Sequence, residues 1–232
     1  MLILPALLFY IAIYIYPLSR IGAWSFFEHG LTLKFYRALL AQPAYFRALA
    51  NTLDISVLST VLCLLFGYPI AYLMATTSAR ARRVLMILIL IPFWTSILVR
   101  TFAWIVILGT HGLVNRALMA LGLISSPLKL LFNMTGVQIG MVHVLLPFMV
   151  FPLFASMMRI DPNILRVARS LGAAPHRAFL HVFLPLSLPG ITAGSVIVFL
   201  LAVGFYITPA LLGGPGQITL ATMIDMEINT FL

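Results

Sequence analysis

Long apolar runs separated by short polar segments dominate the chain. They predict five membrane-spanning helices, at about Leu2–Leu18, Asn51–Thr76, Val84–Leu108, Gly136–Met158, and from Pro185 to about Pro209. The fourth run extends about 34 Å as a helix, which exceeds the hydrocarbon core of a bilayer, about 30 Å. The pattern therefore predicts an all-α, polytopic transmembrane bundle.

The connecting segments predict shorter elements outside the spans. Short apolar or amphipathic patterns predict helices near Phe35–Leu40 and Val114–Leu123. The last stretch, Gln217–Leu232, carries two acids and is too short and too polar to predict a sixth span. No internal repeat or low-complexity tract interrupts this organisation, so we expect one transmembrane domain over residues 1–232.

Composition supports the membrane interpretation and excludes other classes. The chain is 62% hydrophobic and 8% charged, whereas soluble proteins carry about 25% charged residues, so lipid must solvate much of its surface. The net charge of +9 would suggest a nucleic-acid partner in a soluble protein, but here it fits arginines that fix topology, and we expect no nucleic acid. Cys63, the single cysteine, excludes an internal disulfide.

Two basic segments predict the orientation in the membrane. The turn Arg80–Arg83 and the polar island Arg159–Arg177 fall on the same side by alternation of the spans. The dense arginines of the turn place that side in the cytoplasm by the positive-inside rule. We therefore expect a multi-pass membrane protein with these two segments on its cytoplasmic side.

The island Arg159–Arg177 is longer than a simple turn and is punctuated like two short helices. Asp161 is a good N-cap, Pro162 suits the first helical position, Gly172 suits the left-handed end of a helix, and Pro175 begins a second helix. The first helix has an apolar face and a basic face, the latter carrying Arg166 and Arg169. From these residues alone, anionic lipid and a protein partner are both open as its contact.

The island also resembles a known motif. Arg166–Ala173, followed by Leu184–Ile191, resembles the EAA loop of MetI-like permeases of ABC importers, with Gly172 and Pro185 in the expected places. The segments Ile91–Ser96, Val99–Trp104 and Phe205–Gly214 resemble the spermidine/putrescine-type branch of that family, and the similarity extends over nearly the whole chain.

The resemblance implies a function and a set of partners. The chain would be a permease subunit of the bacterial inner membrane, without a catalytic site or cofactor of its own. It would work with a second permease and with a cytoplasmic ABC ATPase dimer that binds ATP and Mg. A periplasmic or extracellular solute-binding protein would deliver the substrate. The expected substrate is a polyamine or a related small organic solute. Coupling would reside in the loop 159–185, on Asp161, Leu165, Arg166, Val167, Ala168, Arg169, Leu171, Gly172 and Ala173.

Three departures from the family pattern stand out. Arg166 occupies a position that is usually acidic, so either the partner groove differs or coupling is altered. Ala174 replaces a side chain that would cap the second helix. The family usually has one more span after the turn at Gly213, and its absence here leaves a fragment or a truncated chain as the explanation.

Several polar or aromatic residues near the spans are candidates for lining a pathway, and each also has a simpler structural explanation. Charges at membrane depth are costly and aromatic side chains often anchor at interfaces. The candidates are Asp54, Trp94, Arg100, Trp104, Tyr206 and Thr208. His143 is expected to be hydrogen-bonded between helices, and the histidine spacing predicts no metal site.

Other classes of membrane protein remain as alternatives. An ion-driven secondary transporter would favour acids deep in the spans and a repeated half, neither of which the sequence contains. A membrane-bound enzyme lacks a catalytic cluster. A non-catalytic assembly subunit is the third alternative.

Overall fold

The computed structural model describes residues 3–27 and 31–231. By internal contacts the chain divides into two compact units, Met1–Arg47 and Ala48–Leu232, which are described separately.

The N-terminal unit is built from apolar helix with little internal packing. α1 (Ile3–Tyr10), a π-helical turn (Ile11–Ile15) and α2 (Tyr16–Trp24) follow one another without a break. None of the window Leu7–Trp24 is buried within the protein, which is what a helix surrounded by lipid or by another subunit requires. α3 (Lys34–Ala41) confirms the short helix predicted near Phe35–Leu40.

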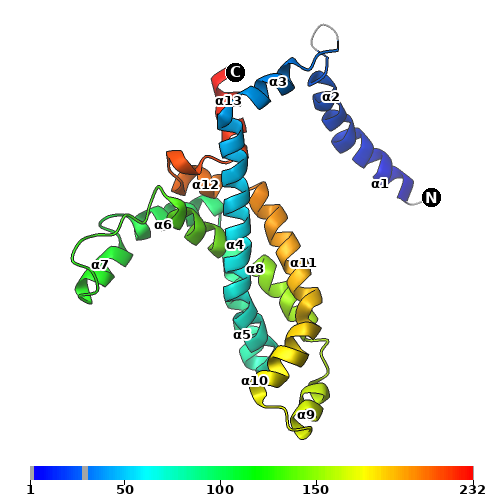
Figure 1. Cartoon of the computed structure of the whole chain (residues 1–232), viewed down its shortest axis with the longest axis vertical. Helices are drawn as coiled ribbons and strands as arrows, with labels where there is room; N and C mark the ends of the chain where they lie inside the picture. Colours follow the sequence, from blue (N-terminus) through cyan, green and yellow to red (C-terminus); the bar gives the residue numbers. More distant parts are fainter. Residues whose placement is uncertain (1–2, 28–30, 232) are drawn as a thin grey trace. The chain divides into compact units, whose positions relative to one another are not determined.

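The second unit is organised around three long helices. They are α4 (Pro43–Thr76), which belongs to this unit from Ala48 onward, α8 (Met134–Met157) and α11 (Leu184–Val203) (Figure 1). The contact between α8 and α11 is extensive. Gly190 and Gly194 lie on the α11 side of this contact: a Cβ at Gly190 would come 2.6 Å from the Ser156 Cβ and 3.0 Å from the Pro152 carbonyl oxygen. Small residues therefore allow the two backbones to approach closely.

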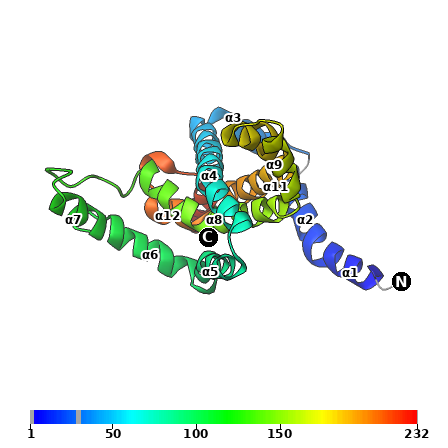
Figure 2. The ribbon, with the colours of Figure 1, turned by 90° about the horizontal axis from the view of Figure 1, so that it is seen from below.

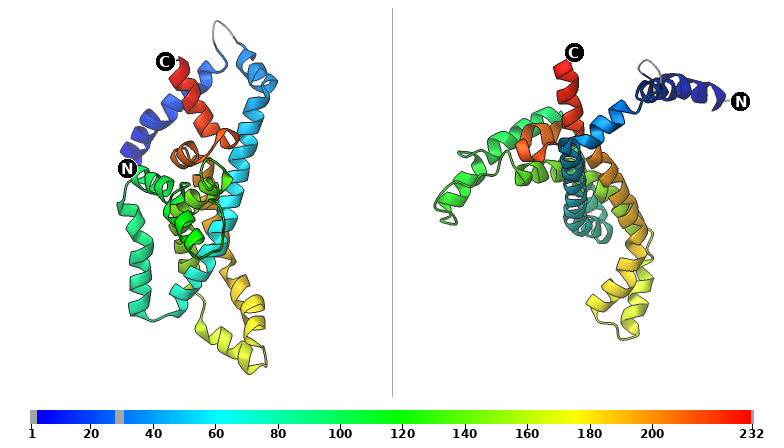
Figure 3. Two further views of the ribbon diagram at one scale, coloured as in Figure 1. Left: turned by 90° about the vertical axis from the view of Figure 1, so that its left-hand side faces the viewer. Right: turned by 45° about the horizontal axis from the view of Figure 1, so that its top comes forward.

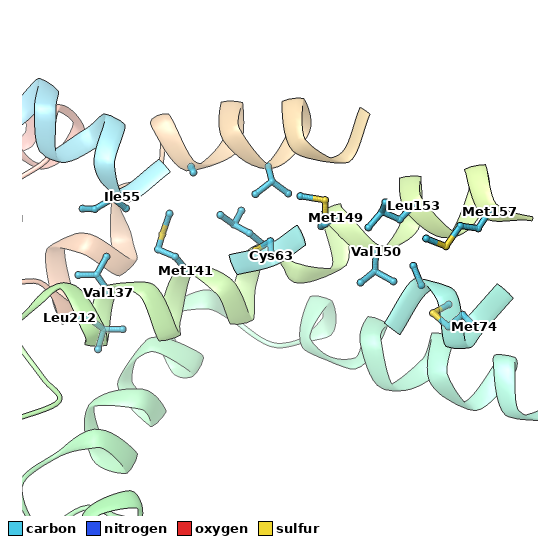
Figure 4. Close-up of a cluster of buried hydrophobic side chains, with 14 of the residues drawn as sticks. Ile55, Cys63, Met74, Val137, Met141, Met149, Val150, Leu153, Met157 and Leu212 are labelled. Carbon is cyan, nitrogen blue, oxygen red and sulfur yellow. The ribbon is translucent and has the colours of Figure 1, made fainter. Parts of the chain in front are cut away.

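Buried apolar side chains run along the length of α8. Met141, Met149 and Leu153 of α8 are fully buried, and Cys63 and Met74 of α4 lie in the same cluster (Figure 4). Methionine is unbranched and fills irregular gaps, which suits a core in which α8 packs on several helices of different direction.

Polar side chains also join α4 to α8 inside the unit. The Ser59 hydroxyl donates to Oε1 of Gln138 at 2.8 Å, and Nε2 of Gln138 donates to the Ile55 carbonyl oxygen at 3.3 Å. Ser59 and Gln138 are both buried. Each of these polar groups has a partner, as burial in an apolar environment requires.

Five segments of the described residues are long and apolar enough to cross a membrane, which confirms the predicted number. They are Leu7–Trp24, Pro43–Thr76, Ile97–Ala120, Met134–Met157 and Pro175–Val203. The second and fourth agree with the predicted spans within a few residues, apart from an extra N-terminal extension of α4 to Pro43.

The predicted third span, Val84–Leu108, is wrong. The structure divides it into α5 (Ala79–Leu90), a 3-10 turn (Ile91–Trp94) and α6 (Ile97–Leu108), and the span candidate is instead α6 with α7 (Leu113–Ala120). Pro92 has no N–H to continue the helix, and Thr95 is extended, so the chain changes direction here. α6 and α7 point away from the three long helices (Figure 2).

The predicted end of the fifth span is also wrong. α11 ends at Val203, and Thr208 and Pro209 belong to a separate helix, α12 (Ile207–Leu212). Gly204 follows α11 with a non-helical conformation, which ends the span earlier than the apolar pattern indicates.

The last helix, α13 (Leu220–Phe231), is bonded to the N-terminal part of α4. The Leu220 N–H donates to the Thr52 hydroxyl oxygen at 2.9 Å, and the Asn51 side-chain amide donates to the carbonyl oxygens of Gly216 and Ile218 at 2.9 and 3.0 Å. These bonds fix the segment between α12 and α13 against α4.

The two basic segments lie at one end of the second unit, as predicted. The start of α5, which carries Arg80–Arg83, and α9 (Pro162–Ser170) both lie at the end opposite α13 (Figures 1 and 3). α9 is the outermost element at that end in both views of Figure 3.

Candidate functional site

The island predicted from the sequence forms a helix, a break and a second helix. The Asn163 N–H donates to Oδ1 of Asp161 at 2.8 Å, so Asp161 satisfies one of the free N–H groups at the start of α9. Pro162 is the first residue of α9, where its missing N–H costs nothing. The sequence prediction of this helix start is confirmed.

Gly172 ends α9 in a left-handed conformation. Its φ is +88°, and the Ala173 N–H donates to the Ala168 carbonyl oxygen at 3.1 Å, the bond typical of a glycine-terminated helix. α10 (Pro175–Ala178) then begins at Pro175, and Ala174 precedes it without a side-chain cap. The predicted break and the predicted absence of a cap are both confirmed.

α9 turns one face toward the protein and another to solvent. Leu165 is half-buried and packs against the apolar core, and Ala168 is also half-buried. Arg166, Val167 and Leu171 are exposed, with Leu171 exposed to 83%. For Arg169 the structure describes only the backbone, as part of α9, so its side chain lies outside the described residues.

An aromatic cluster joins the base of α9 to α4. The chain from α10 enters α11 through a π-helical turn (Phe179–Phe183), which α9 also contacts. Phe179 meets Tyr68 and Tyr72 edge-on, with ring centroids 6.0 and 5.7 Å apart, and the ring of Phe183 lies 5.1 Å from that of Tyr72. Packed rings therefore connect α4 to the turn that α9 contacts.

A hydrogen bond reinforces this junction. The hydroxyls of Tyr68 and Ser187 lie 2.9 Å apart, which links α4 to α11 one turn beyond the π-helical segment. Sequence reasoning did not find the cluster, although the spacing of four residues in both Tyr68–Tyr72 and Phe179–Phe183 was a signal for paired aromatic faces.

The basic turn contributes a second link at the same end. Nε of Arg82 donates to the Met74 carbonyl oxygen at 2.9 Å, which satisfies a free carbonyl at the end of α4. The same guanidinium lies 5.9 Å from the ring centroid of Phe154, on α8. A separate crevice of about 500 Å³ lies between the end of α8, the start of α9 and α11, lined in part by Ser156, Arg159 and Asp161.

Of the pathway candidates, only Trp104 lines a groove of about 510 Å³ between α4, α6 and α8. Nε1 of Trp104 donates to Nδ1 of His143 at 3.2 Å, so the prediction that His143 is hydrogen-bonded between helices is confirmed. An indole N–H can only donate, so Nδ1 of His143 accepts and a neutral ring carries its proton on Nε2.

The other candidates lie apart from that groove. Trp94 is 90% exposed at the end of the 3-10 turn, and Asp54 is exposed on α4. Arg100 is half-buried in the first turn of α6, and its Nε atom is buried without a hydrogen-bond partner among the described residues. The structure therefore does not assemble the six predicted residues into one site.

Tyr206 and Thr208 lie near the other end of the unit. The Tyr206 hydroxyl donates to Oδ2 of Asp225 at 2.7 Å, and this hydrogen bond raises the pKa of Tyr206 above its ordinary value. Thr208 is buried against α8, and its hydroxyl has no hydrogen-bond partner among residues 3–27 and 31–231. Sequence reasoning missed Asp225 as the partner of Tyr206.

The described residues offer a mechanical link and no cluster of metal-ligating side chains. Across the described residues, no group of three or more His, Cys, Asp or Glu side chains could hold a metal ion. What the geometry provides is an exposed helix at one end, attached through packed aromatic rings to helices that cross the membrane.

Known proteins resemble the chain over most of its length. The family model described as "Binding-protein-dependent transport system inner membrane component" matches residues 67–230. The spermidine/putrescine transport system permease protein PotB of Escherichia coli is 37% identical over 203 residues, covering 88% of this chain and 74% of PotB. The molybdenum transport system permease protein ModB of Mycobacterium bovis is 34% identical over 72% of this chain and 61% of ModB.

A solved structure shows the same fold. A chain in the crystal structure of a bacterial alginate ABC transporter, in complex with an alginate-bound periplasmic protein, superposes with a TM-score of 0.78. It covers 98% of this chain and 80% of its own length at 22% identity.

Fold, spans and matches together define a multi-pass transport component of the inner membrane. The chain belongs to the family of binding-protein-dependent transport system inner membrane components, whose permeases have the MetI-like fold predicted from the sequence.

Proposed function

We propose that this chain is a permease subunit of an ATP-driven ABC importer, and that its substrate is a polyamine such as spermidine or putrescine or a related small organic solute. The main support for this substrate class is the 37% sequence identity with PotB over 88% of the chain. The family description, which requires a binding protein, supports the importing direction.

The partners follow from the same proposal. α9 is the element that docks on a cytoplasmic ATPase, because it is the outermost helix of its end and is linked to α4 and α11. The ATPase supplies ATP and Mg chemistry, a second permease completes the pathway, and a periplasmic binding protein delivers the solute. In this arrangement the coupling residues are Asp161, Leu165, Arg166, Val167, Ala168, Arg169, Leu171, Gly172 and Ala173.

Reconstitution tests the proposal directly. The permease pair and its ATPase are placed in proteoliposomes, with the binding protein and labelled spermidine outside and ATP inside. We expect uptake that needs both ATP and the binding protein and that unlabelled putrescine inhibits, whereas glutamate, an anion of similar size, does not.

The alternatives give different results in the same experiment. Uptake driven by a proton or sodium gradient without ATP would identify a secondary transporter. ATP-dependent uptake of another solute would keep the importer class and overturn the polyamine assignment.

A further inference from the structure

The outward face of α9 has an unusual charge for its role. The island Arg159–Arg177 carries four arginines and one aspartate, and Arg166 is exposed on α9 itself. The guanidinium of Arg166 has no hydrogen bond or ion pair with the described residues, and the single acid of the island, Asp161, uses an oxygen to cap the helix.

Apolar side chains accompany Arg166 on the exposed side. Val167 is 57% exposed and Leu171, directly after α9, is 83% exposed. By helical spacing both point away from Leu165, and Arg166 lies on the flank between Leu165 and Val167. Exposed apolar side chains on the same helix as an arginine that has no partner among the described residues are typical of a contact that a partner completes.

We infer that α9 docks into an ATPase groove whose wall carries a carboxylate opposite Arg166, with apolar surface beneath Val167 and Leu171. This inference rests on the proposed function and specifies the chemistry of its partner. An arginine is a suitable anchor there because its planar guanidinium binds a carboxylate through two parallel hydrogen bonds.

The position of α9 favours a protein over anionic lipid as the occupant. α9 lies beyond the ends of α4, α8 and α11, so it extends away from the helices that cross the membrane (Figures 1 and 3). Leu165, on its inner side, is already covered by the protein, so only the exposed Ile164, Val167 and Leu171 would be available to acyl chains, at the end of the unit opposite α13.

Charge reversal tests the contact. The permease is co-expressed with the ATPase encoded in the same operon, and binding of the purified ATPase is measured on permease in nanodiscs of neutral phosphatidylcholine. Arg166→Glu should weaken binding by about tenfold or more, and Arg166→Gln by less, because the first places like charges together. Arg80→Glu is the matched control, since Arg80 is an exposed arginine at the same end and lies off α9.

A genetic test identifies the partner residue. Suppressors of Arg166→Glu that restore ATP-dependent uptake should replace an Asp or Glu of the ATPase by Lys or Arg. The same ATPase variant should be defective with the wild-type permease.

Three results would overturn the inference. Tighter binding of the ATPase to Arg166→Glu would show a basic groove. Equal losses of ATPase binding in Arg166→Glu and Arg80→Glu would show a general charge effect. A loss of binding seen only in nanodiscs with anionic lipid would assign α9 to the membrane surface. Failure of the wild-type permease to bind any ATPase would instead refute the proposed function.

Discussion

Gly172 is the residue on which the geometry of α9 depends most directly. Its φ of +88° lies in the left-handed region, which costs a residue with a side chain about 1–2 kcal/mol. Gly172→Val should therefore shift the angle between α9 and α10, and we expect ATP hydrolysis to continue while uptake per ATP falls severalfold. Both quantities are measured in the same proteoliposomes.

Gly216→Val is the control for this substitution. Gly216 is exposed, has no positive φ, and a Cβ there would meet no atom within 4 Å. The Gly216→Val variant should therefore take up substrate at the wild-type rate. Normal coupling in Gly172→Val would show that the break after α9 does not transmit movement.

The Trp104–His143 hydrogen bond allows a second comparison between single residues. Trp104→Phe keeps an aromatic ring but leaves Nδ1 of His143 without its donor, at an expected cost of about 0.5–2 kcal/mol in the free energy of unfolding. Thermal unfolding in detergent measures this as a lower midpoint. Trp94→Phe, at a position 90% exposed, should leave the midpoint unchanged, and equal midpoints for the two variants would contradict the bond.

Local signals explain why some features of the site were predictable. The cap at Asp161, the left-handed Gly172 and the start of α10 at Pro175 each depend on a few neighbouring residues, so the sequence was sufficient. The partner of His143 lies 39 residues away on another helix, and Asp225 lies 19 residues from Tyr206. Such pairs depend on tertiary packing, which no local pattern encodes.

At the scale of whole elements, hydropathy predicted how many spans exist but not where each begins and ends. The predicted third span failed because apolar composition continues through Pro92, where the backbone cannot continue an α-helix. The predicted fifth span continued past Val203 because Phe205 and Ile207 are also apolar. Helix boundaries are set by backbone hydrogen bonds, and hydrophobicity alone does not report them.

The α8–α11 contact gives a prediction at the same scale. Gly190→Ala would place a Cβ 2.6 Å from the Ser156 Cβ and 3.0 Å from a backbone oxygen, so the helices must separate. We expect a loss of about 1–3 kcal/mol in the free energy of unfolding, seen as a lower thermal midpoint. Gly204→Ala, at the end of α11 where no atom lies within 4 Å of the added Cβ, should be tolerated. Two equally stable variants would show that the contact is looser than described.

At the scale of the whole molecule, the proposed function depends on which end of the second unit faces the cytoplasm. The basic turn and α9 lie at one end of the second unit, and the segment around Gly216 lies near the other (Figure 3). The positive-inside rule predicts that the first end lies in the cytoplasm. Docking on an ATPase is possible only in this orientation.

Thiol labelling distinguishes the two orientations. Cysteines are introduced singly at Ser170 and Gly216, both exposed, and Cys63 serves as the internal control because it is fully buried. A membrane-impermeant maleimide should label position 216 in cells with a permeabilised outer membrane and position 170 only in inverted vesicles. The unmodified chain should stay unlabelled in both. Labelling of position 170 from the periplasmic side would show that α9 cannot contact a cytoplasmic ATPase. That result would exclude the proposed coupling role of α9.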